Sequence, residues 1–329
     1  MNTAQPRRVR PYPEAASSLI GAELEQVEHR LVELLGSREP RLSEIAQYLV
    51  CSGGKRVRPA VAIFVFRACG GESLTDIIDA AVALELIHSA TLLHDDIIDG
   101  SDFRRGNDSA LRKYGLADTL VTGDFLFCRA FELCARFEER VIRWAAEACV
   151  SLTEGEILQA RFRHNAAVTF DDYMEIITRK TASLFRQGAR TGAYLGGADP
   201  NTVEKMAACG FAVGLTFQMV DDLLDVAGNE DRIGKPVGID LRDGNPSLPV
   251  VLALPHDAEL RSLFEKREPT PADIGAALAR VRRSGVLDQV RTLAVGHANH
   301  ARAAMQIIAP SVYRDSLLDL IDQLVERVS

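Results

Sequence analysis

Three aspartates near the end of a long apolar segment are the first residues whose types and spacing indicate chemistry. If the run Leu86 to Asp99 is helical, Asp95 and Asp99 share one face, one turn apart, with His88 and Thr91. Neighbouring carboxylates repel each other unless a cation lies between them. Because their oxygens suit Mg²⁺, which also binds substrate phosphates, this Asp-Asp-x-x-Asp run predicts a magnesium site.

A second copy of the motif strengthens this interpretation. Asp221, Asp222 and Asp225 repeat the spacing, and Gln218 lies one turn before them. A single copy could be a solvated acidic helix end, although the helix dipole disfavours aspartates at a C-terminus. In a bundle, two acidic faces can converge on one cavity and hold several Mg²⁺ ions, so we expect a site for a polyphosphate.

Cations that could bind such a substrate lie in four places. Gly53-Gly54-Lys55-Arg56-Val57-Arg58-Pro59 puts three of them at a predicted helix N-terminus, where N–H groups and the dipole favour an anion. The other places are Arg104-Arg105, Lys180-Thr181 and Lys235. Each alone is typical of an exposed surface cation, and it is their combination with the acidic motifs that favours a diphosphate site.

The pattern favours carbocation chemistry, because no Ser-His or Cys-His pair stands out and such a mechanism needs none. Magnesium would draw a diphosphate away and leave an allylic cation, and that diphosphate could remove the final proton. The protein would supply preorganised charge and a dry apolar tunnel.

The elements that must position these groups are helices. Apolar residues recur with helical spacing along the chain, and the breaks fall at Gly, Pro and Asn clusters. We predict an all-α bundle with helices at 15–35, 41–51, 59–68, 74–99, 117–136, 141–161, 170–195 and 200–226, and several between 258 and 328. Two loops interrupt it, at 100–107 and 228–249, and the second has too many glycines and prolines to be helical.

The composition argues against several functions. The chain has 329 residues, 47% of them hydrophobic, and a formal net charge of -8, which disfavours nucleic acid as a partner. We find no apolar run of about 18 residues and no signal peptide, and we expect residues 1–14 to be a flexible tail and 15–329 the folded domain. The six cysteines form no Cys-x-x-Cys pair, which favours reduced thiols and a cytoplasmic protein.

Taken together, the motifs resemble the trans-polyprenyl diphosphate synthase family. The resemblance lies in the two aspartate motifs, Gly53 to Pro59, Arg104-Arg105-Gly106, Lys180-Thr181, Gln218 and Gly234-Lys235-Pro236. It runs from about Leu19 to the C-terminus and is closest to long-chain members, hexaprenyl to octaprenyl. It implies one domain of antiparallel helices around a deep central cavity, of the isoprenoid synthase type, and usually a homodimer. A heterodimer with this chain as the catalytic subunit stays open.

The resemblance also implies roles for single residues. Isopentenyl diphosphate would be held by Gly54, Lys55, Arg58, His88 and Arg105, and the allylic diphosphate by Arg104, Lys180, Gln218 and Lys235. Three Mg²⁺ ions would be bound by Asp95, Asp96, Asp99, Asp221, Asp222 and Asp225. Lys180, Thr181 and Gln218 would be catalytic, with Thr181 also contacting substrate. One departure is Gly244-Asn245, where many members have Gly-Lys, which removes one cation from the allylic site.

Product length is predicted from the turn before Asp95. Short-chain members resemble this chain but put a bulky aromatic there, whereas Ala90 and Thr91 are small. The tunnel should therefore continue past Ile87, with Phe131 of a facing helix in its lower wall. We expect a product of C30 to C40 that partitions into membranes, with geranylgeranyl (C20) or farnesyl diphosphate as the alternative.

Two other functions would suit a similar sequence. A terpene cyclase resembles this chain in one Asp-rich motif but has a different second motif and no separate basic diphosphate site. A non-catalytic synthase subunit could keep the fold while losing ligands, but this chain retains both aspartate triads and both arginines. We therefore expect a magnesium-dependent prenyltransferase that condenses isopentenyl diphosphate with farnesyl or geranylgeranyl diphosphate.

Overall fold

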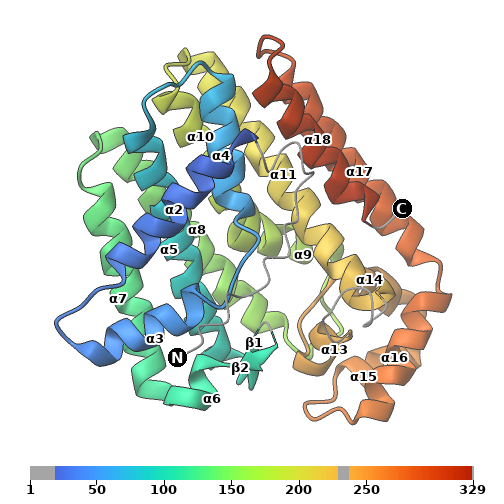
Figure 1. Cartoon of the computed structure of the whole chain (residues 1–329). Coiled ribbons are helices and arrows are strands. Elements are labelled where there is room, and N and C mark those ends of the chain that lie inside the picture. Colours follow the sequence, from blue (N-terminus) through green and yellow to red (C-terminus); the bar gives the residue numbers. More distant parts are fainter. Residues whose placement is uncertain (1–18, 105, 229–236, 328–329) are drawn as a thin grey trace. The chain divides into compact units, whose positions relative to one another are not determined.

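Helices form nearly all of the regular structure, as the sequence predicts. The computed structural model describes residues 19–104, 106–228 and 237–327 (Figure 1). Within them, the strands are the two-residue segments β1 (Phe103–Arg104) and β2 (Asn107–Asp108). The all-α class is confirmed. The predicted tail, Arg105 and Lys235 lie outside the described residues.

The chain divides into two compact units. The first comprises Met1–Ala145, Gly188–Glu204 and Ile308–Leu320. Besides β1 and β2, it contains the helices α2 (Gly21–Leu34), α3 (Pro40–Val50), α4 (Val57–Ala68), α5 (Leu74–Ile98), α6 (Ala110–Tyr114) and α7 (Leu116–Cys134). The single folded domain from 15 to 329 stays a prediction.

The second unit comprises Ala146–Gln187, Lys205–Ile307 and Ile321–Ser329. It contains α9 (Phe170–Ile177), the π-helix η1 (Thr178–Ala182), α13 (Ile239–Asp243), α14 (Leu248–Ala253), the 3-10 helix η2 (Leu254–His256), α15 (Ala258–Phe264), α16 (Pro271–Arg283) and α17 (Val286–Met305). Four of the five unit boundaries fall within α8 (Glu139–Phe162), α10 (Ser183–Leu195), α11 (Pro200–Ala227) and α18 (Val312–Glu326), and the fifth falls between α17 and α18.

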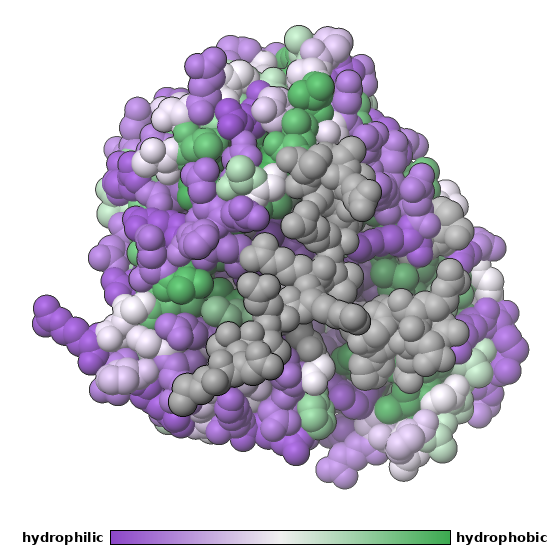
Figure 2. Space-filling view, viewed as in Figure 1, coloured by the Kyte–Doolittle hydropathy of each residue, from purple (hydrophilic) through white to green (hydrophobic). Residues whose placement is uncertain are grey.

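The helix α5, which carries the first aspartate motif, packs against α2, α4, α6 and α7. Its sequence is apolar on all sides, which is typical of a buried core helix. It and α11 are long and apolar enough to cross a membrane, but 83% and 67% of their most apolar windows are buried in the structure. Burial of this kind is expected of core helices in a soluble protein, and the face in Figure 2 is mostly hydrophilic.

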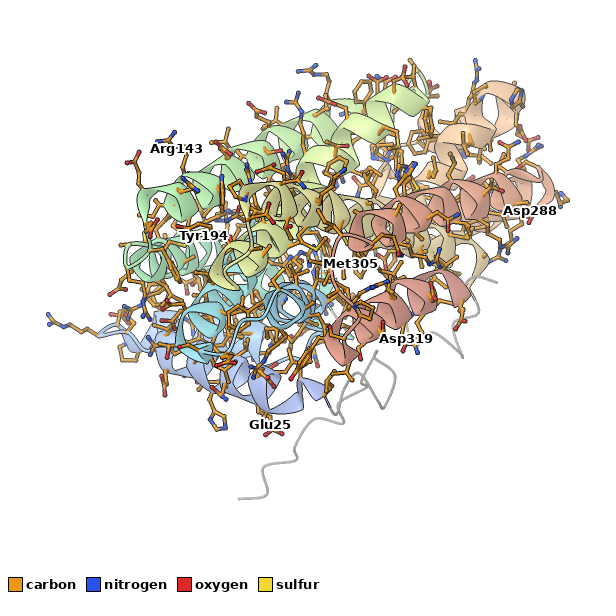
Figure 3. All side chains as sticks on the ribbon, turned by 90° about the horizontal axis from the view of Figure 1, so that it is seen from above. Glu25, Arg143, Tyr194, Asp288, Met305 and Asp319 are labelled. Atoms are coloured by element: carbon orange, nitrogen blue, oxygen red, sulfur yellow. The ribbon has the colours of Figure 1, made fainter. Side chains whose placement is uncertain are left out.

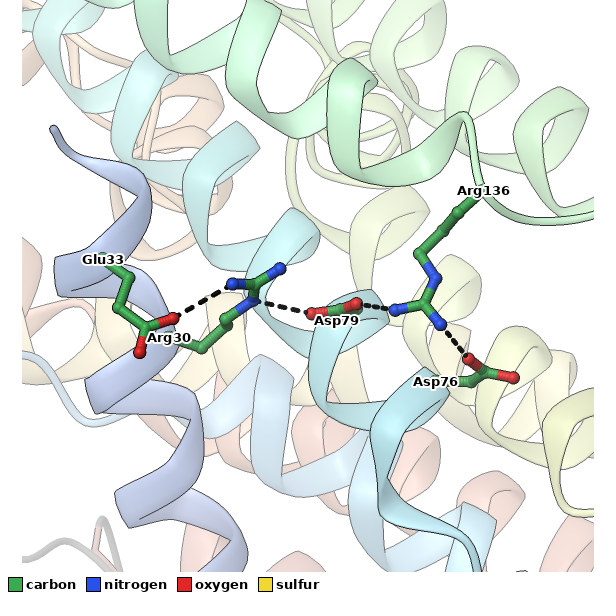
Figure 4. Close-up of polar contacts among 5 residues, drawn as sticks. All are labelled: Arg30, Glu33, Asp76, Asp79 and Arg136. Carbon is green, nitrogen blue, oxygen red and sulfur yellow. Dashed lines mark hydrogen bonds and ion pairs between the residues drawn. The ribbon is translucent and has the colours of Figure 1, made fainter. Parts of the chain in front are cut away.

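An ion-pair cluster holds the N-terminal half of α5. The buried carboxylate of Asp79 accepts from Arg30 Nε of α2 at 3.1 Å and is also paired with Arg136, which follows α7. Arg136 reaches Asp76 at 2.9 Å as well (Figure 4). Because a buried charge is costly unless it is paired, these contacts fix α2 and the end of α7 on α5.

A close helix contact fixes α7 beside the first motif. A Cβ atom at Gly123 would lie 2.2 Å from Nε2 of His94, so a larger residue at this position of α7 would require the His94 ring to move. The same His94 nitrogen lies 3.3 Å from the carbonyl oxygen of Leu120. His94 therefore packs α5 on α7, one residue before the aspartates.

The second unit has its own hydrophobic core. Buried side chains from α9, α11, α14 and α17 meet in it, including Tyr173, Met219, Leu248 and Val290. On α17, Met305 in the last turn is buried, whereas Asp288 in the first turn is exposed (Figure 3).

The loop predicted at 228–249 is wrong in its second half. Residues Ile239–Asp243 form α13, and α14 begins at Leu248. Gly238 and Gly244 flank α13 with φ of 75° and 68°, a left-handed conformation that suits glycine. The glycines that suggested a loop therefore bound a short helix.

Candidate active site

The second aspartate of the first motif does not share a face with the other two. Asp95 and Asp99 are partly exposed, whereas Asp96 is fully buried. The Arg104 guanidinium donates to Asp96 Oδ1 from Nε at 2.8 Å and from Nη2 at 2.6 Å. Burial raises the pKa of Asp96, and Arg104 opposes that rise. Asp96 Oδ2 accepts no hydrogen bond from the described residues, so the carboxylate is held by Arg104 through one oxygen.

The β1–β2 hairpin supplies Arg104. Phe103 pairs with Asp108 and Arg104 with Asn107, and Gly106 in the turn has φ of 79°. The hairpin follows directly on α5, where the Ser101 N–H donates to the carbonyl oxygen of Asp96 at 2.9 Å. This predicted allylic-site arginine is therefore fixed to the metal motif by its side chain and by its neighbouring backbone.

The second motif on α11 repeats this arrangement. Asp221 is exposed, whereas Asp222 is buried and accepts three hydrogen bonds. Their donors are the Tyr173 hydroxyl at 2.7 Å, Gln218 Nε2 at 2.8 Å and the Leu248 N–H at 2.8 Å. Burial raises the pKa of Asp222 to about 7, although these three donors lower it. Its oxygens are thus engaged within the unit.

Asp225 closes the second motif as a helix cap. Its carboxylate accepts from the N–H groups of Ile239 at 3.1 Å and Asp240 at 3.2 Å, and its carbonyl oxygen accepts from Gly238. These donors begin α13, where unpaired N–H groups favour a carboxylate. Of the six predicted metal ligands, Asp221 is exposed and Asp95 and Asp99 are partly exposed, whereas Asp96 and Asp222 are buried and Asp225 caps α13.

The donor set fits magnesium in chemistry. Asp95 and Asp99 lie one turn apart, and all the candidate ligands are carboxylates, which Mg²⁺ prefers. Among the described residues, no group of three or more His, Cys, Asp or Glu side chains is arranged to hold a metal by itself. Mg²⁺ in phosphate-handling sites usually has one or two carboxylates and completes its shell with water and substrate phosphate, which suits this arrangement.

The basic turn before α4 is held by a buried arginine that the sequence analysis assigned no role. Arg56 donates to Glu28 at 2.7 Å and to Glu85 of α5 at 2.6 Å, and it adopts a left-handed φ of 46°. Burial lowers the pKa of Arg56, but the two carboxylates outweigh this and raise it above its usual value. Lys55 is exposed and Arg58 half-buried on either side of this anchor.

Glu85 connects this turn with the α5 stripe. It lies one turn before His88, which is partly buried and precedes Asp95 on the same face. The predicted isopentenyl-site residues of the first unit therefore belong to two elements that Arg56 joins. Nothing in the local sequence distinguishes Arg56 from its neighbouring cations, because its partners are distant in the chain.

Lys180 and Thr181 lie in the π-helix η1. The backbone there is close to α8, since a Cβ at Gly155 would lie 2.7 Å from the Lys180 nitrogen. Lys180 is paired with Glu156, and the Thr181 hydroxyl donates to Gln218 Oε1 at 2.9 Å. π-turns inside helices are frequent at functional sites, and the roles of both residues stay predictions. Glu156 and Tyr173 were not predicted.

The predicted chain-length residues lie in different surroundings. Ala90 and Ile87 are buried in α5, and the Thr91 hydroxyl donates to the carbonyl oxygen of His88 at 2.8 Å. Phe131 of α7 is 42% exposed. Its role in the tunnel wall stays a prediction.

The unusual Asn245 lies beside a cation. Its side-chain oxygen accepts from Arg163 Nε at 3.1 Å, and its backbone N–H donates to the carbonyl oxygen of Asp240 at 2.8 Å. The Arg163 guanidinium therefore lies next to position 245, where many family members have a lysine.

The all-α fold carries two aspartate-rich helices, a basic turn at a helix N-terminus and a π-turn with lysine and threonine. This combination is typical of the class of helical enzymes that act on prenyl diphosphates. Comparison with known proteins supports this. Residues 39–281 match the family model of the polyprenyl synthetases. The chain belongs to the polyprenyl synthetase family.

Relatives of known function cover almost the whole chain. It is 34% identical to geranylgeranyl diphosphate synthase of Methanosarcina mazei over 92% of this chain and 94% of the relative. It is 33% identical to octaprenyl diphosphate synthase of Escherichia coli over 95% and 98%. The crystal structure of a polyprenyl synthase from Caulobacter crescentus, complexed with calcium and isoprenyl diphosphate, has a TM-score of 0.91 and 35% identity, covering 96% and 98%. The chain is thus a prenyltransferase, from a family that uses isoprenyl diphosphates and is generally magnesium-dependent.

Proposed function

We propose that this chain condenses isopentenyl diphosphate with farnesyl or geranylgeranyl diphosphate and makes an all-trans polyprenyl diphosphate of C30 to C40. The observation that carries the proposal is the pair of partly exposed carboxylates, Asp95 and Asp99, on a buried helix that is joined through Arg56 to a basic turn. An acidic face suits a metal-bound diphosphate, and a separate basic turn suits a second one. Two diphosphate sites are what a condensation needs.

The residues divide between these two substrates. Lys55, Arg58 and His88, with the backbone of Gly54 and with Arg105, hold isopentenyl diphosphate, for which cations at a helix N-terminus are well suited. Arg104, Lys180, Gln218 and Lys235 bind the allylic diphosphate. Asp95, Asp99 and Asp221 are the principal ligands of three Mg²⁺ ions, which supply the positive charge that stabilises the departing diphosphate.

The neighbouring aspartates have another task in this scheme. Asp96 orients Arg104, Asp222 orients Gln218, and Asp225 caps α13, so each acts through a residue or segment that it contacts. The allylic C1–O bond breaks with its electron pair passing to diphosphate, C4 of isopentenyl diphosphate bonds to C1, and the released diphosphate takes the proton from C2. Oxygens of Thr181 and Gln218 lie next to the cation formed in between, where their dipoles stabilise positive charge.

Product length follows from the size of the residues before Asp95. Ala90, Thr91 and Ile87 leave room for a long chain, and Phe131 contributes to its lower wall. The names of several relatives, including octaprenyl diphosphate synthase, support this choice. We further propose a cytoplasmic homodimer, with a heterodimer as the alternative, whose product passes into membranes.

The test uses the purified full chain, isopentenyl diphosphate, Mg²⁺ and a geranyl, farnesyl or geranylgeranyl primer. Chromatography of the dephosphorylated products should show C30 to C40, and EDTA should abolish turnover until Mg²⁺ is restored. Asp95→Ala and Asp221→Ala should each lower turnover about 10³-fold or more, with unchanged helical circular dichroism. Asp102→Ala, an exposed aspartate beyond the motif, is the matched control.

Each other outcome has a clear meaning. A C20 product would replace the long-chain assignment by the geranylgeranyl alternative. Turnover that appears only after a second protein is added would replace the homodimer by a heterodimer. If no primer is extended by the folded chain under any of these conditions, the condensation itself is refuted.

A further inference from the structure

Four polar side chains of the second unit form one hydrogen-bonded network. The Tyr173 hydroxyl donates to Asp222 Oδ2 at 2.7 Å, Gln218 Nε2 donates to Asp222 Oδ1 at 2.8 Å, and the Thr181 hydroxyl donates to Gln218 Oε1 at 2.9 Å. Tyr173, Asp222 and Thr181 are buried. The network thus joins α9, α11 and the π-helix η1.

The orientation of the Gln218 amide sets the direction of the hydrogen bonds in this network. Its nitrogen lies 2.8 Å from Asp222 Oδ1 and its oxygen 2.9 Å from the Thr181 hydroxyl, so the NH₂ group donates to Asp222. Its carbonyl oxygen then faces Thr181, whose hydroxyl must donate. A reversed amide would place its carbonyl oxygen against the carboxylate and its NH₂ against Thr181, which would lose one hydrogen bond and add repulsion.

The consequence concerns the free ends of Gln218 and Thr181. Once the Thr181 hydrogen is committed to Gln218, the remaining lone pairs of the hydroxyl oxygen can only accept or meet positive charge. The same holds for the second lone pair of the Gln218 carbonyl. Both oxygens then present the negative end of a fixed dipole, which is the arrangement that stabilises a cation without reorganisation.

The far end of the network is rigid. Asp222 is also held by the Leu248 N–H at the start of α14, and Tyr173 is packed in the hydrophobic core with 1% exposure. Tyr173 is therefore fixed by its ring as well as by its hydroxyl, and its hydrogen bond holds the Asp222 carboxylate in place. The proposed reaction assigns no task to Tyr173.

We propose that Tyr173 is a positioning residue for catalysis, which acts through Asp222 and Gln218 to hold the Thr181 hydroxyl with its oxygen toward the allylic cation. This rests on the proposed function. Because Gln218 and Thr181 are assigned to the allylic site, the Tyr173 hydroxyl should affect the rate of ionisation and leave the binding of isopentenyl diphosphate unchanged.

The first experiment removes the hydroxyl alone. Tyr173→Phe should lower kcat about 10-fold, the effect of one buried hydrogen bond, while KM for isopentenyl diphosphate stays within about twofold of wild type. Tyr194→Phe is the matched control, since the Tyr194 hydroxyl also donates to a carboxylate, that of Glu138 at 2.6 Å, in the first unit. It should keep the wild-type kcat.

The second experiment asks whether the effect passes through Thr181. Thr181→Val removes the oxygen that the network orients, so Tyr173→Phe should cost little further activity in that background. If Tyr173 only supports the fold, the two losses should instead multiply, and the melting temperature should fall in step with activity. Circular dichroism of all four proteins completes the cycle.

Failure of this proposal is distinguishable from failure of the proposed function. A wild-type chain that makes no polyprenyl diphosphate refutes the function. An active wild type with Tyr173→Phe at the wild-type kcat, or with multiplied losses in the double variant, refutes the positioning role alone. A rise in KM with unchanged kcat would also refute it, because it would assign Tyr173 to substrate binding.

Discussion

Arg104 holds the buried Asp96 by two nitrogens on one carboxylate oxygen, at 2.8 and 2.6 Å. Within one Asp-Asp-x-x-Asp motif, this contact distinguishes a buried structural aspartate from two partly exposed ones. On a helix of about 3.6 residues per turn, the second position of the motif is rotated by about 100° from the first. The same separation recurs at Asp222 in the second motif, so it follows from the motif's spacing.

The first prediction contrasts two adjacent aspartates. Asp96→Asn should lower the free energy of unfolding by about 1–3 kcal/mol, because it weakens a buried, charge-assisted contact. Asp95→Asn should change it by less than about 0.5 kcal/mol and yet abolish turnover, since Asp95 is partly exposed and proposed to bind metal. Urea unfolding and initial rates measure the two effects. Equal stability losses for both variants would contradict the distinction.

Much of this arrangement could be predicted from the sequence. The long apolar run that ends in two aspartates one turn apart indicated α5, and the structure has it as Leu74–Ile98 against the predicted 74–99. Helical periodicity also placed Asp95 and Asp99 on one face. These features are local, since they depend on residues within a few turns of one another.

The unpredicted features depend on contacts between distant residues. Arg56 pairs with Glu28 and Glu85, and Tyr173 pairs with Asp222, at separations that no local pattern reports. The helix α13 was missed for a related reason: its first N–H groups are capped by Asp225, more than ten residues earlier. Glycines that suggested a loop from the sequence alone are helix boundaries once that cap is present.

A second prediction concerns the Arg56 anchor. Glu28→Gln weakens its hold on the basic turn without touching Lys55 or Arg58, so KM for isopentenyl diphosphate should rise about 10-fold while KM for the allylic substrate changes less than about twofold. Arg38→Met, at an exposed arginine, is the control and should change neither constant. An equal rise in both KM values would argue against a selective effect on the isopentenyl site.

A third prediction concerns product length. Ala90 is fully buried in α5, one turn before the motif, and Tyr at this position should block the path of a growing chain. Ala90→Tyr should therefore shorten the product to C15 or C20 on chromatography. Because a large side chain in a packed core can cost about 1–3 kcal/mol, the melting temperature must be measured with it. A folded variant with unchanged product length would contradict the tunnel along this face.

The fourth prediction is a pH dependence of stability at His297 on α17. Burial lowers the pKa of His297, and repulsion from His300, whose ring centroid is 5.9 Å away, lowers it further. Between this lowered pKa and the usual value near 6.5, the unfolded chain binds more protons than the folded one, so stability should fall as pH decreases below about 6.5. In His297→Gln this contribution is lost, and the melting temperature should fall less between pH 7.5 and pH 5.5 than in wild type.

His29→Gln, at an exposed histidine of α2, should keep the wild-type profile. If the melting temperatures of wild type and His297→Gln fall in parallel with decreasing pH, protonation of this histidine does not destabilise the fold.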